Sequence, residues 1–159
     1  MSRLTSANLP EIKRRYREEF RPLYEDFASR LRSLLEILIY QSKIPVVQIG
    51  SRIKSAESFV EKLERKNYQN PFEQIKDFLG IRIITFYQDD INEIVKIIRQ
   101  EFELDYTHSV DKTTTITPEA FGYRSVDLII SLSPLRLSLD EWKRFADLCF
   151  SIINPVMCC

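Results

Sequence analysis

Positive side chains gather in one short segment of a chain whose formal net charge is zero. Arg52 and Lys54 stand two residues apart in a stretch that reads as extended, so both side chains leave the same face of the backbone. Ser58, Lys62 and, less closely, Lys66 follow at helical steps of three or four residues. Cations this close repel one another unless an anion lies between them, and a polyphosphate offers several charge-assisted hydrogen bonds of about 1.5–3 kcal/mol each. We therefore predict that this segment binds phosphates.

The same segment contains the start of a predicted helix, which admits two interpretations. Ser55 can cap a helix predicted over residues 55–67, and the free N–H groups at a helix start favour negative charge. Alternatively, the helix is simply solvated, with an i,i+4 pair of Glu61 and Arg65 worth roughly 0.2–0.5 kcal/mol. This alternative accounts for the helical lysines, but not for Arg52 and Lys54 together.

An acidic residue precedes a predicted strand, and Arg82 interrupts its otherwise apolar run. In "DFLGIRIITFY", Asp77 precedes residues 80–87, a β-branched and aromatic run typical of a central strand. A carboxylate at the edge of a strand can hold Mg²⁺ against the phosphates of a nucleotide. Alternatively, Asp77 or another acid neutralises Arg82, because a buried guanidinium needs a partner. Both interpretations remain open on the residue types alone.

A second polar constellation lies in "FGYRSVDLIISL". Strand alternation places Tyr123, Ser125 and Asp127 on one face, which suits stacking of a base on the aromatic ring. Gly122 would allow close approach of the backbone. The alternative is a half-solvated strand with a packed tyrosine.

The remaining sequence predicts the elements that must position these residues. Apolar residues recur at helical spacing over residues 10–41, where Pro22 should bend or split the helix. Asp89 is a plausible N-cap for a helix over residues 89–102. The other expected elements are an extended segment at 45–53, a short helical turn at 71–78, strands near 103–109 and 123–132, and a final apolar run at 145–153. This mixed order predicts an α+β or α/β sandwich with a small central sheet.

Composition limits the class of protein. A length of 159 residues favours one domain, and equal numbers of basic and acidic residues, 23 each, exclude a general nucleic-acid or membrane-surface binder. The cysteines form no CxxC pair, which argues against zinc and disulfides and fits a reducing cytoplasm. No apolar stretch approaches the roughly 20 residues of a membrane span. We interpret His108, the single histidine, as a surface or loop residue without a neighbouring acid pair.

Taken in order, "RIKS" with Ser58 and Lys62, then "DFLGIRII", then "GYRS", resemble the synthetase domain of the RelA/SpoT family over residues 47–132. These enzymes are pyrophosphokinases that make the alarmone (p)ppGpp. The resemblance implies one domain over 1–159, with an N-terminal helical segment (1–44) and a nucleotide-binding core (45–159). The implied α+β fold is a nucleotidyltransferase-like mixed β-sheet flanked by helices. It further implies cytoplasmic, Mg²⁺-dependent transfer of pyrophosphate from ATP to the 3′ hydroxyl of GDP or GTP, releasing AMP.

The resemblance also implies roles for the donor side of the site. Arg52 is similar to a residue that packs on adenine while contacting phosphate. Lys54, Ser58 and Lys62 resemble the set that binds the ATP phosphates.

The catalytic and acceptor sides follow in the same way. Asp77 resembles the aspartate that holds the metal, and Arg82 the arginine of the adjoining strand; both are implied to be catalytic. Tyr123 is similar to the tyrosine that stacks on the guanine of the acceptor, with Ser125 beside it, and Lys112 corresponds to a basic loop residue near the phosphates.

Three positions differ from the family pattern. Asp127 stands where the family has histidine, and Ser151 and Ile153 stand where it has a glutamate and a glutamine, the glutamate serving the metal or the attacking hydroxyl. These differences leave two alternatives, a toxin-type relative that pyrophosphorylates tRNA 3′ ends and a catalytically inactive nucleotide-binding remnant. The core is expected to be incomplete at its C-terminal end, and a homo-oligomer could then cover an exposed sheet edge.

Overall fold

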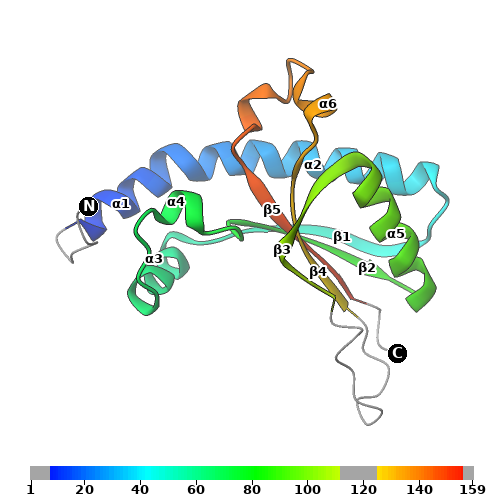
Figure 1. Cartoon of the computed structure of the whole chain (residues 1–159), viewed down its shortest axis with the longest axis horizontal. Coiled ribbons are helices and arrows are strands. Elements are labelled where there is room, and N and C mark those ends of the chain that lie inside the picture. Colours follow the sequence, from blue (N-terminus) through cyan, green and yellow to red (C-terminus); the bar gives the residue numbers. More distant parts are fainter. Residues whose placement is uncertain (1–7, 112–124, 156–159) are drawn as a thin grey trace, which may run out of the picture.

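The computed structural model of the chain describes residues 8–111 and 125–155 (Figure 1). Its helical elements are α1 (Leu9–Arg15), the π-helical η1 (Tyr16–Phe20), α2 (Arg21–Gln41), α3 (Ala56–Arg65), α4 (Pro71–Gln74), α5 (Gln88–Glu101), α6 (Pro134–Leu137) and the 3-10 turn η3 (Lys143–Phe145). Its strands are β1 (Val46–Ile53), β2 (Leu79–Thr85), β3 (Phe102–Asp111), β4 (Ser125–Leu132) and β5 (Cys149–Pro155). The predicted α+β class is therefore confirmed.

The five strands form one mixed sheet in the order β1-β2-β5-β4-β3. Only the β2 and β5 pair is parallel; the other neighbouring strands are antiparallel. The strand predicted at 80–87 is thus an interior strand, but the central position belongs to β5. This order makes β1 and β3 the edges of the sheet, and β5 is paired on both sides. Self-association of the chain stays a prediction.

The N-terminal helical elements run on from one another along the sheet (Figure 1). The predicted interruption near Pro22 takes the form of the π-turn η1, in which the Arg21 N–H donates to the Tyr16 carbonyl, five residues back. Pro22 lies in the first turn of α2, where a missing N–H costs least. The buried stripe of this helical segment consists of Tyr16, Tyr24, Phe27, Ala28, Leu31, Leu35 and Ile39.

One face of the sheet is covered by helices. Helices α2 and α5 contact each other, and both contact β2. Along β2, Ile81 and Ile83 are buried whereas Arg82 between them is exposed, so the two faces differ sharply. We call the other face the open face; by strand register it carries Arg52, Gly80, Arg82, Asp105, Asp127, Ile129, Ser151 and Ile153.

Helix α5 begins one residue earlier than its sequence suggested. Its N-cap is Tyr87, which makes no side-chain capping bond, so the expectation that Asp89 caps this helix is wrong. Asp89 lies instead in the first turn, where a negative charge still complements the helix dipole. Among the described residues, no helix combines the length and apolarity needed to cross a membrane.

Replacing Phe27 with alanine should lower the free energy of unfolding by about 3–5 kcal/mol. Phe27 is fully buried, and its ring centroid lies 4.8 Å from that of Phe145 and 5.7 Å from that of Phe150. Urea denaturation of Phe27→Ala measures the loss. Ile37→Ala on the exposed side of the same helix serves as the control and should stay within about 0.5 kcal/mol of the parent. Equal losses for both variants would contradict this packing.

Candidate functional site

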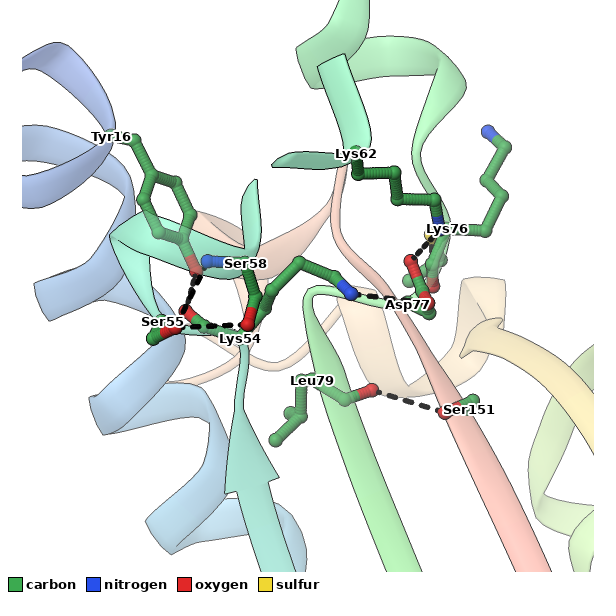
Figure 2. Close-up of polar contacts among 10 residues, drawn as sticks. Tyr16, Lys54, Ser55, Ser58, Lys62, Lys76, Asp77, Leu79 and Ser151 are labelled. Atoms are coloured by element: carbon green, nitrogen blue, oxygen red, sulfur yellow. Dashed lines mark hydrogen bonds and ion pairs between the residues drawn. The ribbon is translucent and has the colours of Figure 1, made fainter. Parts of the chain in front are cut away.

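Two lysines converge on one carboxylate where β1, α3 and the start of β2 meet (Figure 2). The Lys62 Nζ of α3 donates to the Asp77 Oδ1 at 2.7 Å. The Lys54 Nζ, just beyond β1, lies 3.4 Å from the Asp77 Oδ2. Both lysine side chains are mostly buried. One carboxylate therefore contacts two ammonium groups, and the cluster retains a surplus positive charge.

Local capping chemistry orients the helix that carries Lys62. The Ser55 Oγ accepts the Ser58 N–H at 3.1 Å and lies 3.0 Å from the Ser58 Oγ, which confirms the predicted N-cap. The opposite side of α3 is held in the core by Ala56, Phe59 and Leu63, all buried. The stripe that carries Ser58 and Lys62 is thus separate from the face of α3 that packs in the core. No ion pair joins Glu61 to Arg65 within the part of the chain that the structure describes.

The position of Lys54 is set by its backbone. Its N–H donates to the Phe78 carbonyl at 2.8 Å, and its own carbonyl accepts a hydrogen bond from the Tyr16 hydroxyl (Figure 2). Burial raises the pKa of Tyr16 to about 12, so the hydroxyl remains a donor at neutral pH. The N-terminal helix thereby anchors the junction from which the Lys54 side chain reaches Asp77.

The Asp77 carboxylate is ionised at neutral pH because its lysine neighbours outweigh its burial. Burial is the largest single influence and raises the pKa of Asp77. The hydrogen bond from Lys62, the charges of Lys54 and Lys62 and the hydrogen bond from Lys54 together lower that pKa below its ordinary value. The site thus favours the charged carboxylate.

The alternative interpretation of Asp77 as the partner of Arg82 is wrong. Arg82 is exposed on the open face, and it makes no ion pair or side-chain hydrogen bond with any residue that the structure describes. The carboxylate of Asp77 is instead occupied by Lys54 and Lys62. A guanidinium on the open face is not buried and needs no neutralising acid.

Arg52 also lies on the open face, with its backbone in register with Gly80 of β2. It is exposed. A Cβ added to Gly80 would come within 3.4 Å of the Ser151 Oγ and 3.9 Å of the Arg52 carbonyl oxygen. A side chain at Gly80 would therefore be in ordinary van der Waals contact with Ser151 and with the backbone of Arg52 on the edge strand.

The acceptor residues predicted from sequence are only partly described. Tyr123 and Lys112 lie outside the described residues, and Ser125 opens β4, in register with Pro155. Asp127 lies in register with Ile153, which in turn pairs with Arg82, so these three residues form one row across the open face.

One polar pair was missed in the sequence. The His108 Nδ1 lies 2.7 Å from the Asp105 Oδ2, an acidic contact that the sequence interpretation did not foresee. Its interpretation as a surface residue is confirmed, because the side chain is 56% exposed. The signal was present as Asp-x-x-His, because an aspartate commonly binds the backbone N–H groups two and three residues ahead of it in a turn. A strand prediction over 103–109 would point these two residues to opposite faces, which concealed the pair.

The acidic side chains limit how a metal could bind. Among the described residues, no three His, Cys, Asp or Glu side chains gather as a preformed metal site. Magnesium is commonly held by one or two carboxylates together with substrate phosphates. Asp77 therefore fits a magnesium ion that arrives with a polyphosphate, but not a protein-only metal site.

Comparison with known proteins identifies the family. A family model described as a region found in RelA/SpoT proteins matches residues 51–142, which is more than half of the chain and spans the whole lysine and aspartate cluster. This chain belongs to the RelA/SpoT family. The GTP pyrophosphokinase YwaC of Bacillus subtilis (strain 168) is 36% identical over 98 residues, covering 59% of this chain and 45% of that protein. This RelA/SpoT chain thus spans less than half the length of that curated relative.

Solved structures share the fold. The small alarmone synthetase 1 of Bacillus subtilis matches with a TM-score of 0.63 at 22% identity, covering 89% of this chain and 71% of that one. The small alarmone synthetase 2 of the same organism matches with a TM-score of 0.59 at 28% identity, covering 88% and 71%. The resemblance of this RelA/SpoT chain to the family is therefore confirmed in both sequence and fold.

Asp77 should stabilise the folded chain in a pH-dependent way. The pKa of Asp77 is lower in the folded chain than its ordinary value of 3.8. Its contribution to the free energy of unfolding is therefore fully present above pH 3.8 and is lost as the pH falls through the pKa of the folded chain. We expect Asp77→Asn to be less stable than the parent at pH 7, with a difference that shrinks below pH 3.8. Urea denaturation across this range measures it.

Asp140→Asn is the matched control, since Asp140 is highly exposed and, among the described residues, pairs with Lys143 alone. It should change stability little at either pH. An Asp77→Asn variant that is more stable than the parent at pH 7 would contradict the lysine contacts.

Proposed function

We propose that this chain transfers the pyrophosphate group of ATP to the 3′ hydroxyl of GDP or GTP, making (p)ppGpp and releasing AMP. The observation that carries the proposal is the cluster of Lys54, Lys62 and Asp77. It lies within the region that matches the RelA/SpoT family and within a fold shared with small alarmone synthetases. The relative at 36% identity is itself a GTP pyrophosphokinase.

The donor side of the proposal rests on an exchange of anions. A triphosphate carries more negative charge than one carboxylate, and each charge-assisted contact to it is worth about 1.5–3 kcal/mol. Lys54 and Lys62 would turn from Asp77 to the phosphates, beside the N-terminus of α3, where Ser58 lies. Arg52 would then pack on the adenine from the edge of the open face.

Release of Asp77 from its lysines would free a carboxylate for magnesium. The ion, held by Asp77 and the phosphates, would supply Lewis-acid neutralisation of the transferred group. The chain itself supplies mainly position and positive charge, which is most of what phosphoryl-type transfer requires.

The acceptor would occupy the other half of the open face, toward β4. Tyr123, Ser125 and Lys112 are proposed to contact it, and Arg82 would face the transferred group. A protein with the same fold, the small alarmone synthetase 1 of Bacillus subtilis, has been solved bound to its product pppGpp and bound to AMPCPP. These ligands agree with a donor half and an acceptor half.

The direct test incubates the purified chain with magnesium, labelled ATP and GDP, GTP or bulk tRNA. Formation of AMP with a labelled guanosine product is expected. A label on tRNA instead would show that a toxin-type relative is the correct interpretation. Binding of ATP without AMP release would leave a nucleotide-binding remnant, and either of these two results would overturn the proposal.

Asp77→Asn should lower turnover by about 10²-fold or more, because the carboxylate that holds the metal is lost. Its fold should persist, as judged by circular dichroism. Asp140→Asn, which alters an exposed carboxylate away from the cluster, should keep parental turnover. Retention of full activity by Asp77→Asn would argue against the metal role.

Lys62→Met should weaken binding of a non-hydrolysable ATP analogue in the presence of magnesium by about tenfold or more, since one charge-assisted contact is removed. Isothermal titration calorimetry measures the dissociation constant. Arg65→Met, an exposed cation in the last turn of the same helix, is the matched control and should change it less than about twofold. Similar losses in the two variants would indicate a general charge effect.

A further inference from the structure

The edge strand β3 carries a bulge that builds a turn over the sheet. Asp105 pairs with Ile129 and Val110 with Asp127, so residues 106–109 of β3 stand opposite a single residue of β4. The Ser109 Oγ closes the turn by donating to the Asp105 carbonyl and accepting the Ile129 N–H at 2.9 Å. Bulges of this kind commonly redirect a side chain beside an active site.

This turn fixes the orientation of His108. The Asp105 Oδ1 accepts the backbone N–H groups of Thr107 and His108 at 3.0 and 3.2 Å, and its Oδ2 lies 2.7 Å from the His108 Nδ1. Burial, the largest influence, raises the pKa of Asp105, but the hydrogen bonds from His108 and Thr107 together lower it. The ionised carboxylate therefore selects the imidazole tautomer with its proton on Nδ1 and leaves Nε2 directed away.

The pair lies on the open face, at the level of the donor site. Asp105, Ile129, Ser151, Gly80 and Arg52 form one continuous row by strand register. The His108 side chain is 56% exposed, and its Nδ1 contacts Asp105, which lies on this face by register.

A small hollow separates Asp105 from the segment that carries Asp77. Its volume is about 200 Å³, and its lining includes Asp105 of β3 and Lys76, the residue before Asp77. The Cys149 thiol at this point has a raised pKa, chiefly through burial, and both Asp77 and Asp105 add to the effect through their charges. The two carboxylates therefore lie on either side of the start of β5.

Strand β5, which lies between Asp77 and Asp105, carries no carboxylate. Ser151 is buried in register with Gly80, and its Oγ is 3.5 Å from the Leu79 carbonyl oxygen. A neutral serine hydroxyl is a poor acceptor for a proton. The attacking 3′ hydroxyl must nevertheless lose its proton, so another group must take it.

We propose that His108, held by Asp105, is the general base that removes this proton, an inference that rests on the proposed function. The proton passes from the 3′ oxygen to Nε2 as that oxygen forms a bond to the β-phosphorus of ATP. At the same time the β-phosphorus loses its bond to the oxygen that bridges it to the α-phosphorus, and that oxygen leaves as part of AMP. The imidazolium then returns its proton to solvent. Asp105 acts as a positioning residue by holding the tautomer and stabilising the imidazolium.

Asp127 is the other carboxylate on the acceptor half. It lies in the next row, with Ile153 and Arg82, one step farther along the strands from Asp77. No side-chain hydrogen bond orients it among the residues that the structure describes. It is therefore the weaker candidate, and Asp127→Asn belongs in the test.

The experiment measures AMP release by the full chain with saturating ATP, magnesium and GDP, for the parent and four variants. His108→Ala should lower kcat by about 10²-fold or more, with the KM of ATP within about twofold of the parent. Because His108 is half exposed, added imidazole should restore part of the rate in proportion to its neutral form. Asp105→Asn should also lower kcat, since the amide favours the wrong imidazole tautomer. Thr107→Val keeps the backbone N–H of the turn and should retain parental kcat.

Several results would overturn the inference. Full kcat in His108→Ala would exclude the base, as would a loss of kcat that imidazole does not restore at all. A loss confined to Asp127→Asn would assign the role to that carboxylate. A parent chain that releases no AMP with any acceptor would instead refute the proposed function itself, and the inference would fall with it.

Discussion

A single partly buried carboxylate shared by two ammonium groups governs the arrangement of this chain. Asp77 holds Lys54 and Lys62, but it offers one negative charge against two positive ones. Such a cluster is stable only while both lysines keep an anionic partner, and it attracts any anion richer in charge. The formal net charge of the whole chain is zero, so the surplus positive charge of this cluster is local and does not reflect general basicity.

Within the part of the chain that the structure describes, the fold leaves the open face of the sheet without helices. Helices α2 and α5 pack on the covered face, while the parallel β2 and β5 pair places its strand starts beside Asp77. Tyr16 links the N-terminal helix to the Lys54 carbonyl, so the helix that builds the core also positions the site. In the proposed function, the donor and acceptor sides would occupy opposite halves of the open face, joined by rows of residues that cross the strands.

Local chemistry made part of this arrangement predictable. The Ser55 cap and the stripe of Ser58 and Lys62 depend on residues a few positions apart, and both could be derived from the sequence. The pairing of Lys62 with Asp77 could not, because it depends on how α3 lies against the start of β2. The alternative pairing of Asp77 with Arg82 failed because strand alternation turns Arg82 to the open face. The pairing of His108 with Asp105 was not predicted because it depends on a bulge in β3, which the periodicity of the sequence does not reveal.

The most direct test of the account measures binding of a non-hydrolysable ATP analogue by calorimetry, with and without magnesium, to the parent and to Asp77→Asn. If Asp77 and the phosphates compete for the same two lysines, the variant should bind the magnesium-free analogue more tightly than the parent does. The same variant should lose the gain in affinity that magnesium gives the parent. Weaker magnesium-free binding by the variant, or an undiminished magnesium effect, would contradict the exchange of anions on which the account depends.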